Sequence, residues 1–277
     1  MRLSTSTSIH QKVLWKDELF YTCEQSLTAC SRAGYRVMDM HFGNQSRAGG
    51  PMAQPDWEEW VHRQKELADS LGIEFSQAHA PVYIWRDTPA PDTDWNEELV
   101  HRAIVGAGIL GVKWLVMHSG NARDDIWYSY QKSLDVNCEH FKRYGEIADR
   151  YHVGIAIENM IESKLNKRTR RFGSSSEELL ELIIALNDPI FGICWDTGHA
   201  HVSNIDQPSA LRDIGKNLKA LHIADNNGRT DDHNAPYFGT IHWAPILKAL
   251  KEIGYAGDFT FEIYNFAGGL PDGTHDA

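Results

Sequence analysis

The sequence has no long apolar run and no apolar leader. No stretch of about 18 uninterrupted apolar residues is present, which excludes a membrane-spanning helix of the usual kind. The first residues, MRLSTSTS, lead into polar residues without the apolar core of a signal peptide. Together these absences predict a cytoplasmic protein with no membrane partner.

Cysteine is scarce and shows no metal-binding spacing. The four cysteines form no CxxC pair, and Cys23 and Cys30 are seven positions apart in a segment with helical periodicity. We therefore expect buried, reduced thiols, and neither a disulfide framework nor a cysteine metal site.

Positive charge is also in deficit. The 27 Lys and Arg residues face 38 Asp and Glu residues, which gives a formal net charge of −11. A non-specific nucleic-acid binder usually carries a basic field, so the charge disfavours a nucleic-acid partner, although local basic patches remain open. No GxGxxG or GxxxxGK[ST] motif follows the first strand-like run, which disfavours the nucleotide-binding α/β folds.

The sequence does contain a regular alternation of strand-like and helix-like segments. Eight apolar runs read as strands, at 2–8, 35–42, 73–81, 114–120, 154–160, 191–199, 218–226 and 258–265. Helical periodicity lies between them, at 17–33, 57–71, 95–110, 129–151, 177–187, 208–217 and 244–253. Strict alternation predicts parallel strands with right-handed crossovers, and eight units predict a single (β/α)8 TIM barrel over residues 1–277. A doubly wound open sheet is the alternative.

Boundary residues support these helices. Asp56 or Asp94 is expected to cap the helix that follows it, and Ser174 to Ser176 precede acidic first-turn residues. A glycine stands between helix and strand at Gly34, Gly72, Gly111 and Gly254. Only FAGGLPDGTHDA follows the eighth strand, so the last helix is expected to be missing, very short or supplied by another subunit. The apolar barrel surface left bare would then favour a homo-oligomer.

Imidazole and carboxylate side chains recur near the ends of six successive predicted strands. Because the ends of parallel barrel strands meet at one face, these groups are expected to share one pocket. They are His79, His118, Glu158, Asp196, His199, His222, Asp231, His233 and Glu262. Such ligands suit Zn, Mn, Fe or Co, and carboxylates also transfer protons.

Each of these residues also has an ordinary structural interpretation. Glu158 and Glu262 lie in apolar strands, where a carboxylate is costly unless it is paired or bound to a metal, and those strands hold no basic partner. Asp196 is also compatible with a helix cap, and His222 with a satisfied core histidine. His79 and His118 fit substrate hydrogen bonding as well as ligation, and Asp231 and His233 fit a solvated loop. The remaining histidines are not expected to be ligands, and His62, His101, His140 and His152 are expected on helix surfaces.

The ordered motifs HAP, MHSG, IEN, DTGH, HIADN…DxH…GTIxW and FEI resemble the xylose isomerase-like TIM barrel superfamily, the sugar phosphate isomerase/epimerase group. That group is related to the type IV apurinic endonucleases. The resemblance covers roughly residues 70–265, and it departs from the sugar-active pattern at GTIHW, where His242 replaces the more usual Asp. In the sugar-active members four residues hold one divalent ion, which implies Glu158, Asp196, His222 and Glu262 here. In the endonuclease-type members the extra ligands would fall on His79, His118, His199, Asp231 and His233.

The resemblance implies a metal-dependent isomerase or epimerase of a sugar, sugar phosphate or related polyol. One divalent ion (Mn, Co, Zn or Fe) is the first expectation, and two or three are the alternative. Glu158 and Glu262 would move protons through a cis-enediolate, and His199 would hydrogen-bond a substrate oxygen. His79 is a further candidate for substrate binding, and Trp85 is expected to cover a sugar face or simply to pack in its loop.

A basic loop, KLNKRTRRFG, follows the fifth predicted strand. Its cations are Lys164, Lys167, Arg168, Arg170 and Arg171, with Arg171 as the candidate ligand of a substrate phosphate or carboxylate. A solvated basic loop is the equally simple interpretation. The alternative functions are a multi-zinc phosphodiester hydrolase of the apurinic-endonuclease type, a polyol or inosose dehydratase, and a non-catalytic sugar-binding barrel.

Overall fold

The computed structural model describes residues 1–10, 21–83, 92–124, 127–162 and 170–264. Eight parallel strands form one sheet in the order β10-β1-β2-β3-β4-β7-β8-β9. They are β1 (Leu3–Ser6), β2 (Val37–His41), β3 (Glu74–His79), β4 (Trp114–His118), β7 (Gly154–Glu158), β8 (Phe191–Asp196), β9 (Leu218–His222) and β10 (Phe259–Phe261). The predicted (β/α)8 barrel is confirmed, and each strand lies within a predicted strand range.

The two end strands of this order close the barrel. Ile223, directly after β9, bridges to Phe261 of β10. Its amide donates to the Thr260 carbonyl at 2.8 Å, and the Glu262 amide donates to the Ile223 carbonyl at 3.0 Å. All strands therefore end at the same rim of the barrel, which puts the residues at their carboxyl ends around one mouth.

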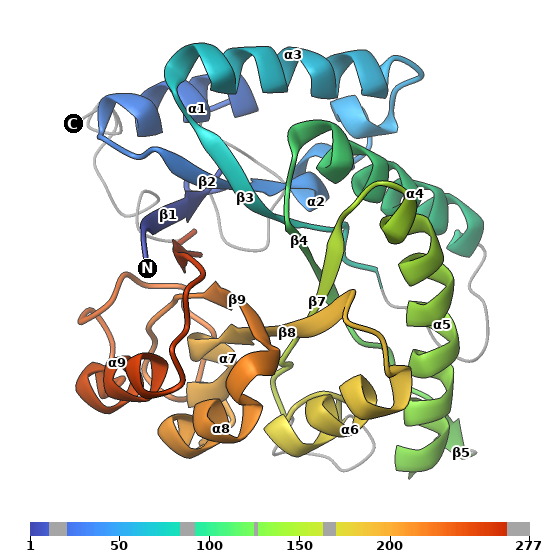
Figure 1. Ribbon diagram of the computed structural model, residues 1–277, viewed down its shortest axis with the longest axis vertical. Helices are drawn as coiled ribbons and strands as arrows, with labels where there is room; N and C mark the ends of the chain where they lie inside the picture. The colour runs from blue at the N-terminus through green and yellow to red at the C-terminus, as the bar shows by residue number, and fades with distance from the viewer. Residues whose placement is uncertain (11–20, 84–91, 125–126, 163–169, 265–277) are drawn as a thin grey trace.

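Helices surround the strands (Figure 1). The longer ones are α1 (Cys23–Arg32), α3 (Trp57–Leu71), α4 (Thr93–Leu110), α5 (Tyr130–Arg150), α6 (Ser176–Leu186), α8 (Gln207–Ile214) and α9 (Trp243–Glu252). Short elements lie between them: α2 (Phe42–Gln45), η1 (Pro51–Ala53), β5 (Arg123–Asp124), β6 (Trp127–Tyr128), α7 (Thr197–Val202) and η3 (Gly215–Asn217). None of the helices among the described residues combines the length and apolar character that crossing a membrane requires.

Several helix boundaries differ from the predictions. The Asp56 side chain makes no capping hydrogen bond, and Asp94 lies inside α4, which begins at Thr93. The strand predicted over 191–199 ends at Asp196, because the Asp196 carboxylate accepts the His199 amide at 2.6 Å and starts α7. The predicted Ser cap is present: the Ser175 hydroxyl accepts the amide of Glu178 at 3.3 Å.

The predicted glycine positions agree with the structure. Gly34, Gly72, Gly111 and Gly254 all have positive φ between 66° and 98°, a region that side chains rarely adopt. The expected absence or shortness of the last helix concerns residues 265–277, which lie outside the described residues. The extent of the domain, 1–277, also stays a prediction.

The four thiols are free, as predicted, but one histidine does not lie where the sequence places it. The four cysteines are free, and Cys23, Cys30 and Cys194 are buried, whereas Cys138 is only half-buried. The prediction that His140 lies on a helix surface is wrong. Its side chain is 9% exposed and packs edge-on against Tyr144 at 4.8 Å between ring centres. Burial, followed by the charge of Arg143, lowers the pKa of His140 to about 3.

The barrel interior has two unlike halves just below the mouth. In the apolar half, Val116, Ala156, Cys194 and Ala220 of β4, β7, β8 and β9 pack together. In the polar half, the buried residues of β1, β2, β3 and β10 include Ser6, Asp39, Gln77 and Thr260. Except for Ser6, each of these residues stands two positions before an imidazole or carboxylate at the rim, and therefore on the same face of its strand.

Candidate metal and catalytic site

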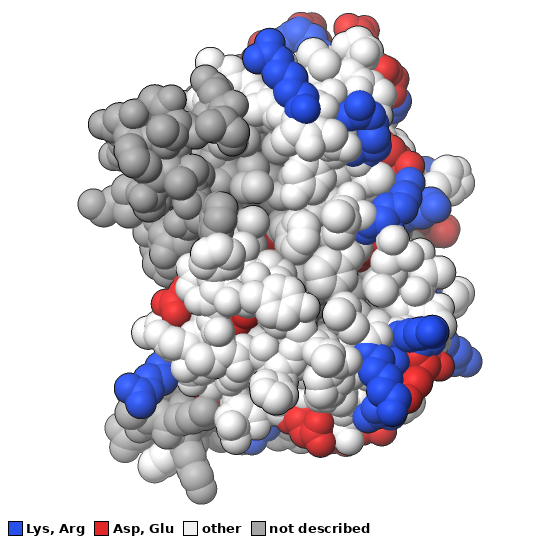
Figure 2. Space-filling model, turned by 90° about the vertical axis from the view of Figure 1, so that its left-hand side faces the viewer, with Lys and Arg blue, Asp and Glu red and all other residues white. Residues whose placement is uncertain are grey.

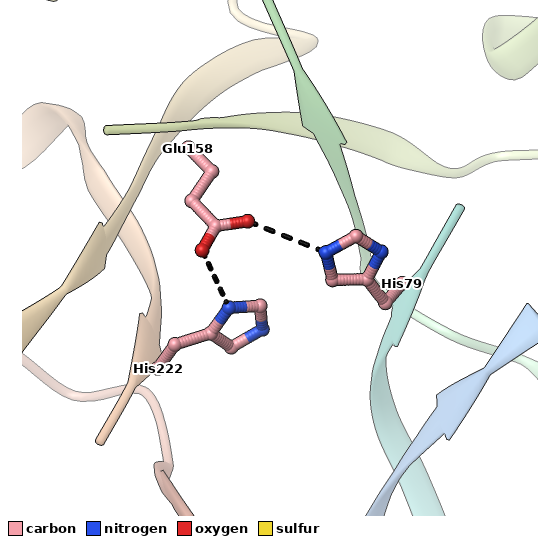
Figure 3. A group of neighbouring side chains, drawn as sticks. All are labelled: His79, Glu158 and His222. Atoms are coloured by element: carbon pink, nitrogen blue, oxygen red, sulfur yellow. Dashed lines mark hydrogen bonds and ion pairs between the residues drawn. The ribbon is translucent and has the colours of Figure 1, made fainter. Parts of the chain in front are cut away.

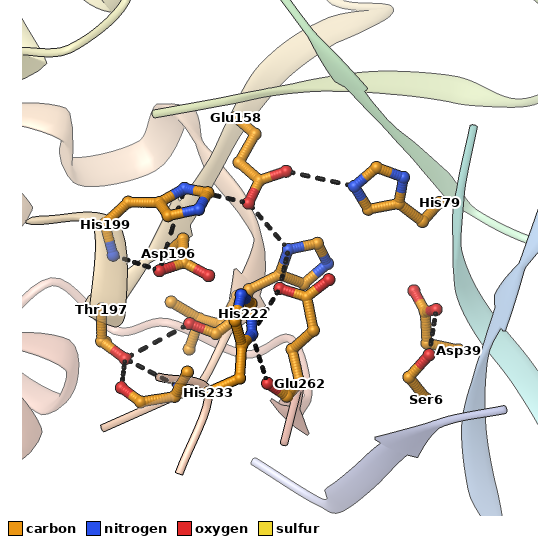
Figure 4. Close-up of polar contacts among 12 residues, drawn as sticks. Ser6, Asp39, His79, Glu158, Asp196, Thr197, His199, His222, His233 and Glu262 are labelled. Carbon is orange, nitrogen blue, oxygen red and sulfur yellow. Dashed lines mark hydrogen bonds and ion pairs between the residues drawn. The ribbon is translucent and has the colours of Figure 1, made fainter. Parts of the chain in front are cut away.

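The structure brings the predicted histidines and carboxylates together at the mouth of the barrel (Figure 4). Three groups have ligand atoms that all lie within 4.8 Å of one another. They are His79 with Glu158 and His222; Glu158 with Asp196, His222 and Glu262; and His199 with Asp231 and His233. We call these the His79 group, the central group and the His199 group. Glu158 and His222 belong to the first two, so the groups are contiguous.

Glu158 stands at the centre of the contacts (Figure 3). Its Oε1 lies 3.0 Å from His222 Nδ1 and 3.5 Å from His199 Nδ1. Its Oε2 lies 2.9 Å from His118 Nε2 and 3.3 Å from His79 Nε2. Glu158 is 1% exposed, and these contacts are with imidazoles, not with the Lys or Arg of an ordinary buried salt bridge. An acid surrounded in this way suits a bridging metal ligand.

The central group adds Asp196 and Glu262. Glu262 Oε2 lies 3.3 Å from the same His222 Nδ1 that contacts Glu158. Asp196 is fully buried, with Oδ1 on the His199 amide and Oδ2 without a hydrogen-bond partner among the described residues. A buried carboxylate oxygen in this position costs free energy unless a cation or donor meets it. The donor set and this oxygen therefore fit a divalent metal ion.

The His199 group has the same character. Asp231 Oδ2 lies 3.3 Å from His199 Nε2 and 3.1 Å from His233 Nε2, while its Oδ1 has no hydrogen-bond partner in the described part of the chain. The ordinary interpretation of Asp231 and His233 as a solvated pair does not hold, because His233 is 3% exposed.

A buried aspartate, Asp225, shapes the loop that carries these residues. Its carboxylate accepts the amides of Asn226, Tyr237 and Ile241, and the indole N–H of Trp243, at 2.8 to 3.1 Å. Gly239 is required beside it, since a Cβ there would lie 2.2 Å from Asp225 Oδ1. The GTIHW segment is therefore folded around Asp225, and the unusual His242 is exposed at the start of α9.

Three histidines are oriented by backbone carbonyls. The Nδ1–H groups of His79, His199 and His233 donate to the carbonyls of Ala80, Asn159 and Glu262 at 2.7, 2.8 and 2.8 Å. Because the carbonyl can only accept, the proton is assigned to Nδ1 and Nε2 is left for a ligand. This arrangement is characteristic of metal-binding histidines.

The electrostatics show how the carboxylates are balanced. Burial alone would raise the pKa of Glu158, but the His222 and His118 rings outweigh it and hold the pKa well below its usual range. Burial likewise lowers the pKa of His199, but Asp196 and Asp231 reverse the effect and raise it well above its ordinary value. Imidazolium protons thus provide the positive charge that the carboxylates need. A metal ion would displace such protons, so its binding is expected to weaken as pH falls.

The predicted substrate-binding roles of Trp85 and Arg171 stay predictions. Trp85 lies outside the described residues, as do Lys164, Lys167 and Arg168. Arg171 is exposed, and no hydrogen bond or ion pair joins it to the cluster within the described ranges. Arg170 is engaged elsewhere, since its Nη2 lies 2.7 Å from Glu178 Oε1.

Three residues near the cluster were not predicted. Asp39 of β2 is 1% exposed, and burial raises its pKa. His41 stacks on His79, with ring centres 4.9 Å apart, and Tyr264 donates a hydrogen bond to Glu262 Oε1. The only sequence signal for them is position: Asp39 and His41 share the face of β2 that turns to the barrel interior, and Tyr264 stands two residues after Glu262.

Comparison with known proteins places this geometry in a family. The family model described as xylose isomerase-like TIM barrel matches residues 27–276. The chain therefore belongs to the xylose isomerase-like TIM barrel family. An uncharacterized protein of Methanocaldococcus jannaschii is 32% identical over 171 residues, which is 61% of this chain but only 56% of that relative's length.

Two named relatives point to different chemistries. A ketose 3-epimerase of Arthrobacter globiformis is 28% identical over 131 residues, covering 46% of this chain and 42% of the relative. A probable endonuclease 4 of Mycoplasmopsis pulmonis is 25% identical over 213 residues and covers 72% of each chain. Neither match alone assigns an activity.

Solved structures agree with the fold. A D-tagatose 3-epimerase-like protein has a TM-score of 0.76 at 23% identity, covering 97% of this chain and 92% of the other. D-psicose 3-epimerase, crystallised in the presence of D-fructose, has a TM-score of 0.73 at 14% identity, covering 100% and 94%. At these identities the similarity establishes the barrel fold alone.

Proposed function

We propose that this protein is a metal-dependent isomerase or epimerase of a sugar, sugar phosphate or related polyol. The observation that supports it most is the convergence of Glu158 and Glu262, from β7 and the end of β10, on one His222 nitrogen within the central group. Two carboxylates beside one metal position can act as the general base that takes a proton from a carbon acid and the general acid that returns one. The sugar 3-epimerases among the relatives and structural neighbours support the same class.

Glu158, Asp196, His222 and Glu262 would hold the ion, and Asp196 Oδ2 would gain the partner that it lacks. When bound, the metal supplies positive charge that stabilises the enediolate formed from an α-hydroxy ketone. One glutamate takes the proton from the carbon next to the carbonyl, and the other returns a proton to that carbon or its neighbour. The proton count of the substrate is therefore unchanged. His199 would hydrogen-bond the substrate oxygen that changes charge through Nε2, because its Nδ1–H donates to the Asn159 carbonyl.

The second candidate is a multi-metal phosphodiester hydrolase. The His79 and His199 groups favour it, because they extend the central group into a cluster that could hold two or three ions. The probable endonuclease 4 relative favours it too. The net charge of −11 opposes it. On the face shown in Figure 2, Lys and Arg side chains gather mainly along one edge and alternate there with Asp and Glu, so the described residues of this face form no continuous basic surface.

The decisive test is incubation of the Mn²⁺-loaded protein with D-fructose, D-tagatose and their phosphates in D₂O, followed by NMR. Deuterium at the carbon next to the carbonyl, together with an epimeric or isomeric ketose or aldose, is the expected result. Glu262→Gln is the control and should show neither. Cleavage of abasic DNA by the same preparation, without deuterium exchange, would replace the first proposal with the second.

A further inference from the structure

Tyr264 is a buried residue of the mouth, two positions after Glu262. Its side chain is 9% exposed, and its hydroxyl donates a hydrogen bond to Glu262 Oε1. We propose that Tyr264 is a positioning residue: its hydroxyl holds Oε1 of Glu262 and so leaves Oε2 as the single oxygen that Glu262 offers to the metal group. This inference rests on the metal site of the proposed function, but not on the identity of the substrate.

The place of the hydroxyl is fixed by contacts of the ring. The Tyr264 ring stacks on His233, with centres 4.8 Å apart and planes 25° apart. It also meets the His41 ring edge-on, with ring centres 5.8 Å apart and planes at 78°. Aromatic contacts of this kind need no hydroxyl, so phenylalanine could keep them. The ring geometry therefore separates packing, which Phe retains, from the hydrogen bond, which it loses.

The direction of the bond follows from the chemistry of its two partners. A phenol hydroxyl carries a proton and a carboxylate oxygen can only accept one, so Tyr264 donates to Glu262 Oε1. A hydrogen bond from a neutral donor to a carboxylate is shorter and stronger than one between two neutral groups.

The consequence appears when the two glutamates are compared. Both oxygens of Glu158 face imidazoles, with His222 Nδ1 3.0 Å from Oε1 and His118 Nε2 2.9 Å from Oε2. Among the described residues, only Oε2 of Glu262 closely faces an imidazole, at 3.3 Å from His222 Nδ1, while Oε1 accepts the hydrogen bond from Tyr264. Glu158 can thus serve two groups, whereas Tyr264 confines Glu262 to one oxygen in the central group. Partners of this kind typically change metal affinity about 10- to 100-fold.

Titration of chelator-treated protein with Mn²⁺ at constant pH tests the role of the hydroxyl. Tyr264→Phe should bind Mn²⁺ about 10-fold more weakly in one class of site, with an unchanged number of sites. The electron paramagnetic resonance spectrum of the bound Mn²⁺ should also change, since the freed carboxylate can bind through both oxygens. Tyr255→Phe is the matched control: the hydroxyl of this half-buried tyrosine donates to the Asp258 carbonyl at 3.2 Å, before β10, and its removal should leave both readouts unchanged.

Wild-type affinity and spectrum in a folded Tyr264→Phe protein would overturn the proposal. If that variant does not fold, the crystal structure of the wild-type protein with Mn²⁺ decides. The proposal requires Tyr264 within hydrogen-bond distance of a Glu262 oxygen that does not touch the ion, and it is overturned if both Glu262 oxygens do. Absence of ketose turnover would reject the proposed function and leave these Mn²⁺ results interpretable.

Discussion

Both halves of the barrel wall carry polar side chains at the mouth, but the residues below them are apolar in one half and polar in the other. On β4, β7, β8 and β9, the residues below His118, Glu158, Asp196 and His222 are Val116, Ala156, Cys194 and Ala220, an apolar cluster. On β10, β2 and β3, the residues below Glu262, His41 and His79 are Thr260, Asp39 and Gln77, and Ser6 of β1 joins them. One half is apolar beneath the rim, and the other is lined with side chains that can form hydrogen bonds.

This difference explains how the rim charges are compensated. Among the described residues no side chain of the apolar cluster hydrogen-bonds Glu158, and its contacts run sideways to imidazoles at the ends of β3, β4 and β9. A low-dielectric floor also strengthens those contacts. In the polar half, Ser6 Oγ donates to Asp39 Oδ1 at 3.3 Å, as Figure 4 shows, while Asp39 Oδ2 and Thr260 Oγ1 have no hydrogen-bond partner in the described part of the chain. Glu158 in the apolar half is thus closely paired with imidazoles, whereas Asp39 and Thr260 in the polar half each have one oxygen without a partner among the described residues.

The largest effect is expected from Glu158→Gln in the apolar half. Glutamine removes the charge and offers only one carbonyl oxygen, so it cannot face the imidazoles on both sides as the carboxylate does. Turnover in the ketose assay should fall roughly 10²- to 10⁴-fold, the usual contribution of a general acid or base. Metal content by elemental mass spectrometry should fall as well.

Glu262→Gln sharpens the comparison between the two glutamates. Glu262 belongs only to the central group of candidate ligands, whereas Glu158 belongs to the central and the His79 groups. Metal content should therefore fall less in Glu262→Gln than in Glu158→Gln, although turnover should be lost in both. Equal metal content in the two variants would contradict the bridging position of Glu158. Wild-type turnover in Glu158→Gln would remove it from the catalytic role.

A smaller effect is expected from Ala156→Ser, which places a hydroxyl in the apolar floor. Ala156 is fully buried among Val116, Cys194 and Ala220. An unpaired buried hydroxyl costs about 2 kcal/mol, and urea unfolding should show a loss of that order. Ala156→Gly is the control for backbone effects. A serine variant as stable as the wild type would mean that the floor already contains hydrogen-bonding partners.

The fold could be predicted from the sequence because its signals are local. Strand-like runs alternate with segments of helical periodicity, and Gly72 and Gly111 end their helices in the left-handed conformation. The errors arise where a side chain competes with the backbone pattern. Asp196 ends β8 early by capping α7, a contact that apolar periodicity cannot reveal. The short β5–β6 hairpin has too few residues to show any period.

The candidate ligands could be predicted because each follows a strand, and parallel strands bring their ends together. Their partners could not. Tyr264 matters through one hydrogen bond to Glu262, and Asp39 through burial below the rim; neither feature has a sequence motif. His140 was misplaced because its burial depends on packing beside Tyr144. The ligand roles themselves stay predictions that metal analysis must test.

A titrating residue outside the barrel interior, His140, provides a reference for the pH dependence of stability. His140 lies on α5, and its pKa is lowered from 6.5 to about 3. In the unfolded chain this histidine is protonated below pH 6.5, whereas in the folded chain it stays neutral down to about pH 3. The free energy of unfolding therefore falls as the pH falls through this window. Between pH 6.5 and 5.5 the loss from this group is about 1 kcal/mol.

His140→Phe should remove that part of the pH dependence, because phenylalanine keeps the ring and does not titrate. Urea unfolding of both proteins at pH 6.5 and 5.5 measures the difference. Equal slopes in the two proteins would show that His140 is protonated without penalty in the folded state. If the free energy of unfolding depends less on pH in His140→Phe than in the wild type, the dependence that is left in the variant comes from other groups, including those of the barrel interior.

The smallest effect is expected in the polar half, from Thr260→Val. Thr260 is fully buried, and its Oγ1 has no hydrogen-bond partner among the described residues. Valine replaces this hydroxyl with a methyl group of nearly the same shape, so no hydrogen bond is lost. The free energy of unfolding should change by less than about 0.5 kcal/mol or rise slightly. Ala156→Ser adds an atom as well as a polar group to a packed apolar site, whereas Thr260→Val keeps the shape of the side chain and changes only its polarity. A loss of about 2 kcal/mol in Thr260→Val would mean that Oγ1 is hydrogen-bonded after all.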